Sequence, residues 1–309
     1  MTHPLRTLRL GTRGSPLALV QARLVAAALC AAHGWGDDAI AIVPVRTTGD
    51  RVQDRPLAEI GGKALWTKEL DRALLDGDID FAVHSMKDVE TIRPAGIAIA
   101  AMLPRADVRD RLVGAESIAV LAQGARIGTS SPRRAAQLRH LRPDLAIVPF
   151  RGNVDTRLRK LAEGEADATL LAAAGLDRLS RGEVGHAIPI DVMLPAPAQG
   201  AVGIEARADD AETLVRLAAI DDLATHVCVL AERALLAALG ADCHSPVAAL
   251  ARIEGSTIDI AAALFSEDGA HSCADRLSFH AYRPDEAGLL ADRLLAQAPP
   301  VLARLFAGR

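Results

Sequence analysis

The chain has 309 residues, enough for two or three domains with substantial cores. Half of the residues are hydrophobic and only 3% are aromatic, which fits packed α/β layers and argues against modules that stack aromatic rings on nucleic-acid bases. The net charge of −4 implies no nucleic-acid partner, and we expect no long apolar span and no signal-peptide core. These features predict a soluble cytoplasmic protein without a membrane partner.

A turn of similar sequence occurs twice along the chain. The sequences GTRGSP at residues 11–16 and GTSSPRR at residues 128–134 each close an apolar run and open a segment with helical spacing. Ser131 is a good N-cap residue, and Pro132 suits the first position of a helix. We expect the first of these two helices to run over residues 16–33 and to end at Gly34.

Two further pairs of segments extend this repeat. Residues 42–46 (IVPVR) are similar to residues 147–151 (IVPFR), and residues 77–83 are similar to residues 164–170. Helical spacing precedes each member of the second pair, over residues 67–75 and 156–163. The resulting β-α-β-α-β order predicts two doubly wound lobes with mainly parallel sheets. Residues 47–62 form an insertion, which we interpret as a mobile loop that could act as a lid.

The remaining segments complete the domain organisation. Residues 200–205 are typical of a strand that returns to the first lobe, and helical patterns follow at residues 209–220 and 223–239. Strands at 256–265 and 271–280 and a helix at 284–297 indicate a small α+β domain. We predict a first lobe of residues 1–103 and 198–219, a second lobe of residues 104–197, and a C-terminal domain of residues 220–309.

Arginines recur where such lobes bind ligands, at the carboxyl ends of strands and the N-termini of helices. Arg133 and Arg134 fall in the first turn of the second repeated helix, where the helix dipole disfavours cations, so we expect an anion to bind there. A solvated arginine pair is the alternative. The other arginines at strand ends, which together indicate a site for several carboxylates or phosphates, are Arg13, Arg151, Arg157 and Arg178.

Ser85, Lys87 and Asp88 follow the predicted strand at residues 80–83 and carry a hydroxyl, an ammonium and a carboxylate. Asp88 is the one acid clearly placed among these basic groups. Its functional interpretation is a carboxylate, kept ionised by the arginines, that stabilises a positive charge developing on a substrate. A salt bridge to Lys87 or an N-cap is the structural alternative.

The cysteines form no CxxC pair, so neither a zinc site nor a redox dithiol is indicated, and we expect no metal. Cys30, Cys228 and Cys273 lie in apolar or strand-like segments. Cys243 lies in a small polar loop, where His244 could raise its thiolate content. An inert loop cysteine is the alternative interpretation.

Eight motifs, taken in order, resemble the hydroxymethylbilane synthase family, also called the porphobilinogen deaminase family. They cover about residues 9–251 and comprise GTRGSPLAL (11–19), GGKALWTKELD (61–71), DFAVHSMKD (80–88), IGTSSPRRAAQL (127–138), PFRGNVDTRL (149–158), AAGLDRL (173–179), QGAVGIE (199–205) and the Cys243 loop. The resemblance implies two lobes like those of periplasmic binding proteins, plus the small C-terminal domain.

The resemblance also implies an activity. Family members join four porphobilinogen molecules head to tail with release of ammonia, and then hydrolyse off a linear tetrapyrrole used in haem and porphyrin biosynthesis. The chain grows on a dipyrromethane cofactor held by a thioether to a cysteine, here Cys243, and the catalytic aspartate is Asp88. The enzyme is expected to be a cytoplasmic monomer.

Further residues match positions of the family that bind cofactor, bind substrate or lie in a mobile loop. The cofactor-binding matches are Ser15, Ser85, Lys87, Asp88, Thr129, Ser130, Ser131, Arg133, Arg134 and Arg151, the substrate-binding matches are Arg13, Arg151, Arg157 and Arg178, and the mobile-loop match is Lys63. Several positions depart from the usual family pattern, namely Val20, Ala64, Trp66, Glu90, Ala198, His244 and Ser245.

Two other classes of protein share part of this pattern. A two-lobed anion-binding receptor or regulator domain would fit the repeated lobes equally well, but it would not need Asp88 together with Cys243. A phosphate-handling transferase would carry a GxxxxGK[ST] loop or metal-binding carboxylates, and the sequence has no such loop.

Overall fold

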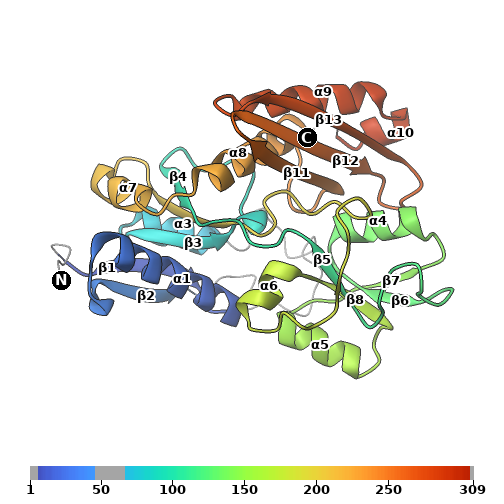
Figure 1. Cartoon of the computed structure of the whole chain (residues 1–309), viewed down its shortest axis with the longest axis horizontal. Helices are drawn as coiled ribbons and strands as arrows, with labels where there is room; N and C mark the ends of the chain where they lie inside the picture. Colours follow the sequence, from blue (N-terminus) through green and yellow to red (C-terminus); the bar gives the residue numbers. More distant parts are fainter. Residues whose placement is uncertain (1–5, 46–66, 307–309) are drawn as a thin grey trace. The chain divides into compact units, whose positions relative to one another are not determined.

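The computed structural model describes residues 6–45 and 67–306. The chain separates into two compact units, one formed by residues 1–105 and 201–226 and the other by residues 106–200 and 227–309. The first unit contains one sheet and the second contains two, within the described residues (Figure 1). The helix α8 (Leu223–Ala238) begins in the first unit and ends in the second.

The first unit is built on a five-stranded sheet of order β2-β1-β3-β10-β4. Its strands are β1 (Leu8–Arg13), β2 (Ile40–Val45), β3 (Phe81–Ser85), β4 (Ile97–Met102) and β10 (Val202–Arg207). The strand β1 runs parallel to β2 and β3, whereas β10 runs antiparallel to β3 and β4. The predicted return of the chain to the first lobe is therefore confirmed by β10.

In the described part of the first unit, three α-helices and two short 3-10 turns accompany this sheet. They are α1 (Pro16–His33), η1 (Asp37–Ala39), α3 (Lys68–Leu75), η2 (Met86–Asp88) and α7 (Ala211–Ala218). The predicted bounds of α1 are confirmed, because the Ser15 hydroxyl accepts a hydrogen bond from the Ala18 N–H and Gly34 ends the helix at φ 67°.

The expectation that the chain has no long apolar span is wrong for α1. This helix has 18 residues with a mean hydropathy of 1.4, so by length and composition alone it could cross a membrane. A core helix of a soluble protein meets the same criterion. In the structure, the apolar residues Ala22, Val25 and Leu29 belong to one buried cluster with strand residues of the sheet.

The second unit repeats the same sheet with the order β7-β6-β8-β5-β9. The strands are β5 (Asp110–Val113), β6 (Arg126–Gly128), β7 (Ala146–Val148), β8 (Ala168–Ala172) and β9 (His186–Ala187), and the accompanying helices are α4 (Pro132–Leu141), α5 (Val154–Ala162) and α6 (Ala173–Arg178). The internal repeat predicted from the sequence is thus present as two sheets of equivalent strand order.

Both five-stranded sheets are mainly parallel, as predicted, because four of the five strands in each of them point the same way. In each of them the fourth strand, β10 or β5, is antiparallel to its neighbours. The reason lies in the chain path, because β10 follows the second lobe in sequence and β5 follows the first. Each of these strands enters its sheet from a crossover between lobes and not from a local β-α-β connection.

The glycines of the two repeated turns are required by close packing. A Cβ atom on Gly11 would lie 2.2 Å from Cδ1 of Ile79, and one on Gly128 would lie 2.5 Å from ring atoms of Phe150. Both neighbours are fully buried and have no room to retreat. The shared GT sequence therefore reflects the same packing requirement at the ends of β1 and β6.

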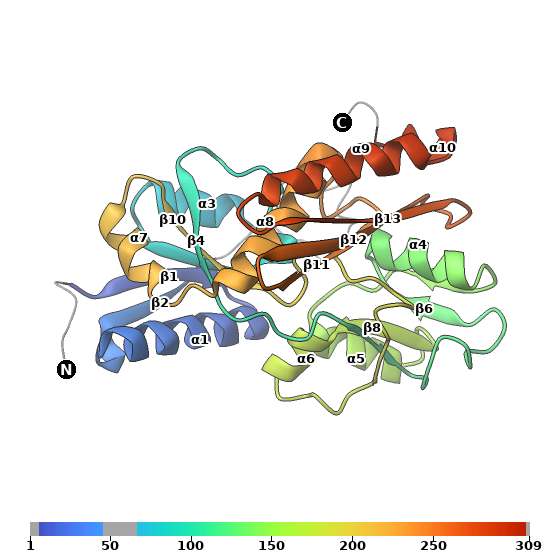
Figure 2. The same ribbon diagram turned by 45° about the horizontal axis from the view of Figure 1, so that its top comes forward.

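The C-terminal part of the second unit is an antiparallel sheet of β11 (Val247–Glu254), β12 (Thr257–Phe265) and β13 (Ser272–His280). The predicted last helix divides into η3 (Pro284–Ala287) and α9 (Gly288–Gln297), and α10 (Pro300–Ala303) follows. Figure 2 shows α9 lying along this sheet. Leu290 and Leu294 of α9 belong to the same buried cluster as residues of the sheet. Ala136 of α4 packs on the sheet beside Ala263 and Phe265.

Candidate active site

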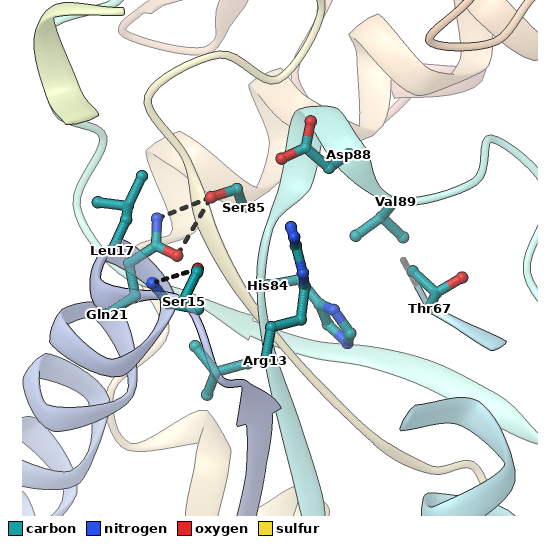
Figure 3. A pocket seen from close by; sticks show the side chains of 11 residues that line it. Arg13, Ser15, Leu17, Gln21, Thr67, His84, Ser85, Asp88 and Val89 are labelled. Carbon is teal, nitrogen blue, oxygen red and sulfur yellow. Dashed lines mark hydrogen bonds between the residues drawn. The ribbon is translucent and has the colours of Figure 1, made fainter. Parts of the chain in front are cut away.

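A pocket lies in the first unit at the carboxyl ends of β1 and β3 and beside the N-terminus of α1 (Figure 3). It is a shallow, open pocket, whose room for water-sized molecules is about 60 Å³. The residues that line it are Arg13, Ser15, Leu17, Ala18, Gln21, Thr67, Val83, His84, Ser85, Asp88 and Val89. Ligands of α/β sheets bind at such strand ends, so the pocket is a candidate binding site.

Asp88 is held at the pocket by a short turn. The strand β3 ends at Ser85 and passes directly into η2. Its first residue, Met86, is buried and donates its N–H to Ala201 O at 3.1 Å. The Val89 N–H then donates to Met86 O at 3.2 Å. Asp88 is half-buried at the end of this turn, and in Figure 3 the Arg13 side chain extends from β1 in its direction.

Four of the predicted site residues meet in this one pocket, namely Arg13, Ser15, Ser85 and Asp88. Lys87 is half-buried next to them and does not line it. Sequence reasoning missed Gln21, whose Nε2 donates to the Ser85 Oγ at 2.8 Å. The signal was available, because Gln21 is a polar residue on the apolar face of α1.

Sequence reasoning also missed a buried charge cluster behind the pocket. Glu205 of β10 is completely buried, and its Oε2 lies 3.2 Å from His84 Nε2. Its Oε1 accepts a hydrogen bond from Arg93 Nε at 2.8 Å. Burial alone would raise the pKa of Glu205, but His84 and the Arg93 guanidinium outweigh it and lower that pKa to about 2.

The other predicted residues belong to the second unit, where the N-terminus of α4 is capped as expected. Ser131 Oγ accepts the Arg134 N–H at 3.4 Å, and Thr129 Oγ1 accepts the Ser131 N–H at 3.2 Å. Thr129 is buried, whereas Ser130 is exposed. Backbone N–H groups and hydroxyls are thus gathered where the anion was predicted.

The arginines of this turn already have an anion from their own chain. Arg133 Nη1 lies 2.8 Å from Asp110 Oδ2, and Arg134 Nη2 lies 2.7 Å from Asp110 Oδ1. Burial would raise the pKa of Asp110, but the two guanidiniums hold it well below its usual range. Since two buried cations surround one carboxylate, a positive charge remains in excess at the α4 N-terminus.

Three further arginines of this lobe were predicted to bind anions, and two of them, Arg157 and Arg178, lie in the helices α5 and α6. Arg178 Nη2 donates to Gly200 O at 2.8 Å, and burial lowers the pKa of Arg178. Arg157 Nε donates to Gly152 O at 3.0 Å. The Nη1 atom of Arg151 is buried and makes no hydrogen bond within the described part of the chain.

Cys243 lies in the loop between α8 and β11 and is exposed, as predicted. The loop is fixed on both sides of it, because Asp242 Oδ1 accepts the His244 N–H at 2.9 Å and the Asp242 N–H donates to Ser245 Oγ at 3.1 Å. Burial raises the pKa of the Cys30 and Cys273 thiols, which makes them poorer nucleophiles.

Lys63 and the predicted lid at 47–62 lie outside the described residues. Within residues 6–45 and 67–306, no group of three or more His, Cys, Asp or Glu side chains could hold a metal ion. Among the described residues, the first unit therefore offers a pocket with an arginine, hydroxyls and a carboxylate, and the second unit offers further arginines and hydroxyls and one exposed thiol.

Such an arrangement suits an enzyme that handles a substrate with several carboxylates. Family models agree with this class: "Porphobilinogen deaminase, dipyromethane cofactor binding domain" matches residues 8–215, and "Porphobilinogen deaminase, C-terminal domain" matches residues 226–296. The chain belongs to the porphobilinogen deaminase family.

Two relatives match the chain over nearly its whole length. The porphobilinogen deaminase of Sphingopyxis alaskensis is 59% identical over 316 residues, which is 99% of both chains. That of Paracoccus denitrificans is 50% identical over 303 residues, which is 97% of both chains. The periplasmic VFT2 domain of Bordetella pertussis BvgS, a solved structure, is 15% identical with a TM-score of 0.40 over 71% of this chain and 87% of that one.

Proposed function

We propose that Asp88 is the catalytic carboxylate of this enzyme and that Cys243 carries its dipyrromethane cofactor. The reaction is that of the family: four porphobilinogen molecules are joined head to tail with loss of ammonia, and the linear tetrapyrrole is released by hydrolysis for tetrapyrrole biosynthesis. When bound, the dipyrromethane supplies the pyrrole carbon to which the first porphobilinogen is joined.

The arginines support this proposal through the chemistry of the substrate. Each porphobilinogen unit carries an acetate and a propionate, so a growing chain brings many carboxylates, which guanidinium groups bind through paired hydrogen bonds. The buried Nη1 of Arg151 has a hydrogen bond to give, and the Arg133–Arg134–Asp110 cluster keeps an excess positive charge. We assign carboxylate binding to Arg13, Arg133, Arg134, Arg151, Arg157 and Arg178.

Asp88 is suited to the charge that the reaction develops. Loss of ammonia from porphobilinogen leaves a cationic azafulvene, and an ionised carboxylate held beside it stabilises that cation without moving. After the free pyrrole carbon of the growing chain has attacked the azafulvene methylene, the carboxylate can accept the proton that this attacking carbon loses. The turn of Met86 and Val89 fixes Asp88 at the pocket, and Ser85 and Lys87 flank it as proposed cofactor contacts.

Cys243 is the cysteine best placed to be modified. Its thiol is exposed on a loop that hydrogen bonds fix on both sides, whereas Cys228 is buried and Cys30 and Cys273 are half-buried. We propose a thioether between its Sγ and the dipyrromethane. Ser15, Thr129, Ser130 and Ser131 are proposed to donate hydrogen bonds to the cofactor.

Intact mass under denaturing conditions tests the cofactor assignment. The parent protein and the Cys273→Ser control should carry an excess mass equal to two linked pyrrole units, and Cys243→Ser should lack it. If the parent lacks the excess even after incubation with porphobilinogen, the cofactor assignment is wrong and a non-catalytic anion receptor becomes the better interpretation.

Turnover of Asp88→Asn tests the catalytic assignment. The variant should fold and retain its cofactor, but porphobilinogen consumption should fall by at least about 100-fold, because the amide cannot stabilise a cation or take a proton. Asp76→Asn, at the end of α3 outside the pocket, is the matched control and should keep parent activity. Near-parent activity of Asp88→Asn would refute the assignment.

We further propose that the enzyme works as a monomer in the cytoplasm, without nucleic-acid or membrane partners. Sedimentation equilibrium at micromolar concentration measures the first point, and a mass of twice the chain would contradict it.

A further inference from the structure

The segment of residues 84–93 carries Asp88 near its middle. The carboxylate of Glu205 contacts the residues at both ends of this segment. Glu205 Oε2 lies 3.2 Å from His84 Nε2 at the start of the segment. At its end, Arg93 Nε and Nη2 donate to Glu205 Oε1 and Oε2 at 2.8 and 2.9 Å. The segment is therefore closed into a loop by a side chain of β10.

Arg93 also donates hydrogen bonds to two more carboxylates. Its Nη2 donates to Asp71 of α3, and its Nη1 donates to Glu90 Oε2 at 3.4 Å. The Arg93 side chain is only 7% exposed and that of Glu205 is fully buried. Burying a guanidinium and a carboxylate is costly unless both are paired and hydrogen-bonded, so these contacts hold the segment strongly in one place.

The cluster also connects Asp88 with a second wall of the pocket. Asp71 lies one turn into α3, and Thr67, the residue that precedes α3, lines the pocket together with Asp88. Arg93 thus bridges the loop that carries Asp88, the strand β10 and the helix α3. Glu90 also belongs to this cluster.

We propose that Arg93 is a positioning residue, which fixes Asp88 at the pocket by closing the loop of residues 84–93 on Glu205 and Asp71. The inference rests on the proposed catalytic role of Asp88. Arg93 itself does not line the pocket and acts on turnover through the loop.

The first experiment compares Arg93→Met with Arg207→Met in the holoenzyme, with rates counted per molecule that carries the cofactor by mass. Arg207 is a matched control, since it lies two residues beyond Glu205 on β10 and donates to Leu74 O, Ile79 O and Asp210. For Arg93→Met we expect kcat to fall roughly 10- to 100-fold with KM within about 3-fold, because a misplacement near 1 Å costs that much. Arg207→Met should change kcat less than about 3-fold.

A second readout does not depend on turnover. Amide hydrogen exchange of the peptides covering residues 84–93 should speed up at least about 10-fold in Arg93→Met and stay at the parent rate in Arg207→Met. If Arg93→Met fails to fold, Arg93→Lys keeps the charge but loses the paired hydrogen bonds, and kcat should then fall about 3- to 10-fold. Parent kcat and parent exchange in the folded Arg93 variant would overturn the proposal.

Combination with Asp88→Asn shows whether Arg93 acts through Asp88. The double variant Asp88→Asn/Arg93→Met should be no slower than Asp88→Asn alone, since the group being positioned is already lost. An additive loss would overturn the positioning role. Near-parent turnover of Asp88→Asn would instead overturn the role of Asp88, whereas an inactive Asp88→Asn beside a fully active Arg93→Met would overturn only the role of Arg93.

Discussion

Gly203 offers a direct way to displace the catalytic turn. It lies on β10 opposite His84, and a Cβ atom there would lie 2.1 Å from Sδ and 2.7 Å from Cγ of Met86. Carbon–carbon contacts are comfortable at roughly 3.5–4.0 Å, so Met86 must retreat by about 1.5 Å or more in Gly203→Ala. Because Met86 is only 1% exposed, its side chain cannot turn out into solvent, and we expect the turn of residues 86–88 to move with it.

The expected losses of stability and of turnover both follow from this overlap. Overpacking of this kind costs about 1–3 kcal/mol of unfolding free energy. A shift of Asp88 near 1 Å would lower turnover by up to about 100-fold. Gly203→Ala should therefore lose far more activity than stability, with the cofactor still attached.

Steady-state porphobilinogen consumption and urea unfolding of the same preparations measure the two effects. Gly288→Ala is the control, because its Cβ would lie an ordinary 3.6 Å from Ala238 Cβ, and it should keep parent turnover. The double variant Gly203→Ala/Met86→Ala removes the overlapping atoms and should recover turnover relative to Gly203→Ala. Parent turnover in Gly203→Ala, or no recovery in the double variant, would refute the idea that Met86 sets the position of Asp88.

Two further predictions concern buried charges. The pKa of Glu205 is about 2 in the fold and near 4.5 when unfolded, so its stabilisation is complete above pH 4.5 and is lost as the pH falls from 4.5 toward 2. Urea unfolding at pH 5, 4 and 3 should show a decline in unfolding free energy, of which Glu205→Gln abolishes about 2 kcal/mol between pH 5 and pH 3. Equal slopes in both proteins would contradict this. Asp110→Asn leaves the Arg133 and Arg134 guanidiniums without their carboxylate and should destabilise the second unit by about 3–5 kcal/mol. The control is Asp107, whose ion pair with Arg109 is partly exposed. Asp107→Asn should lose less than about 1 kcal/mol of unfolding free energy when both variants are measured by thermal and urea unfolding. Similar losses in both variants would contradict the assignment.

Local signals in the sequence predicted the local structure well. Ser15 and Gly34 define the ends of α1 because capping and the left-handed conformation depend on neighbouring residues only. The repeated GT turns predicted the two related lobes, and the polar loop predicted the exposure of Cys243. The strands β4, β5 and β9 were not predicted.

Features that depend on distant partners could not be predicted in this way. Arg93 and Glu205 are 112 residues apart, and no spacing rule brings them together. For Arg133 and Arg134 the sequence predicted an anion from the helix dipole, and the structure adds that Asp110 of β5 supplies one. Pairings of this kind are set by the order of strands, which depends on the crossovers between lobes.

Those crossovers have a consequence for how the protein is made. The first sheet needs β10, which ends at residue 207, so a nascent chain that has emerged only to residue 105 leaves the facing edges of β3 and β4 without a partner. Unpaired strand edges favour aggregation, and contacts between distant segments form slowly. The ribosome must therefore deliver the whole second lobe before the first can close, and a truncated gene product ending between the lobes would be a client for chaperones and proteases.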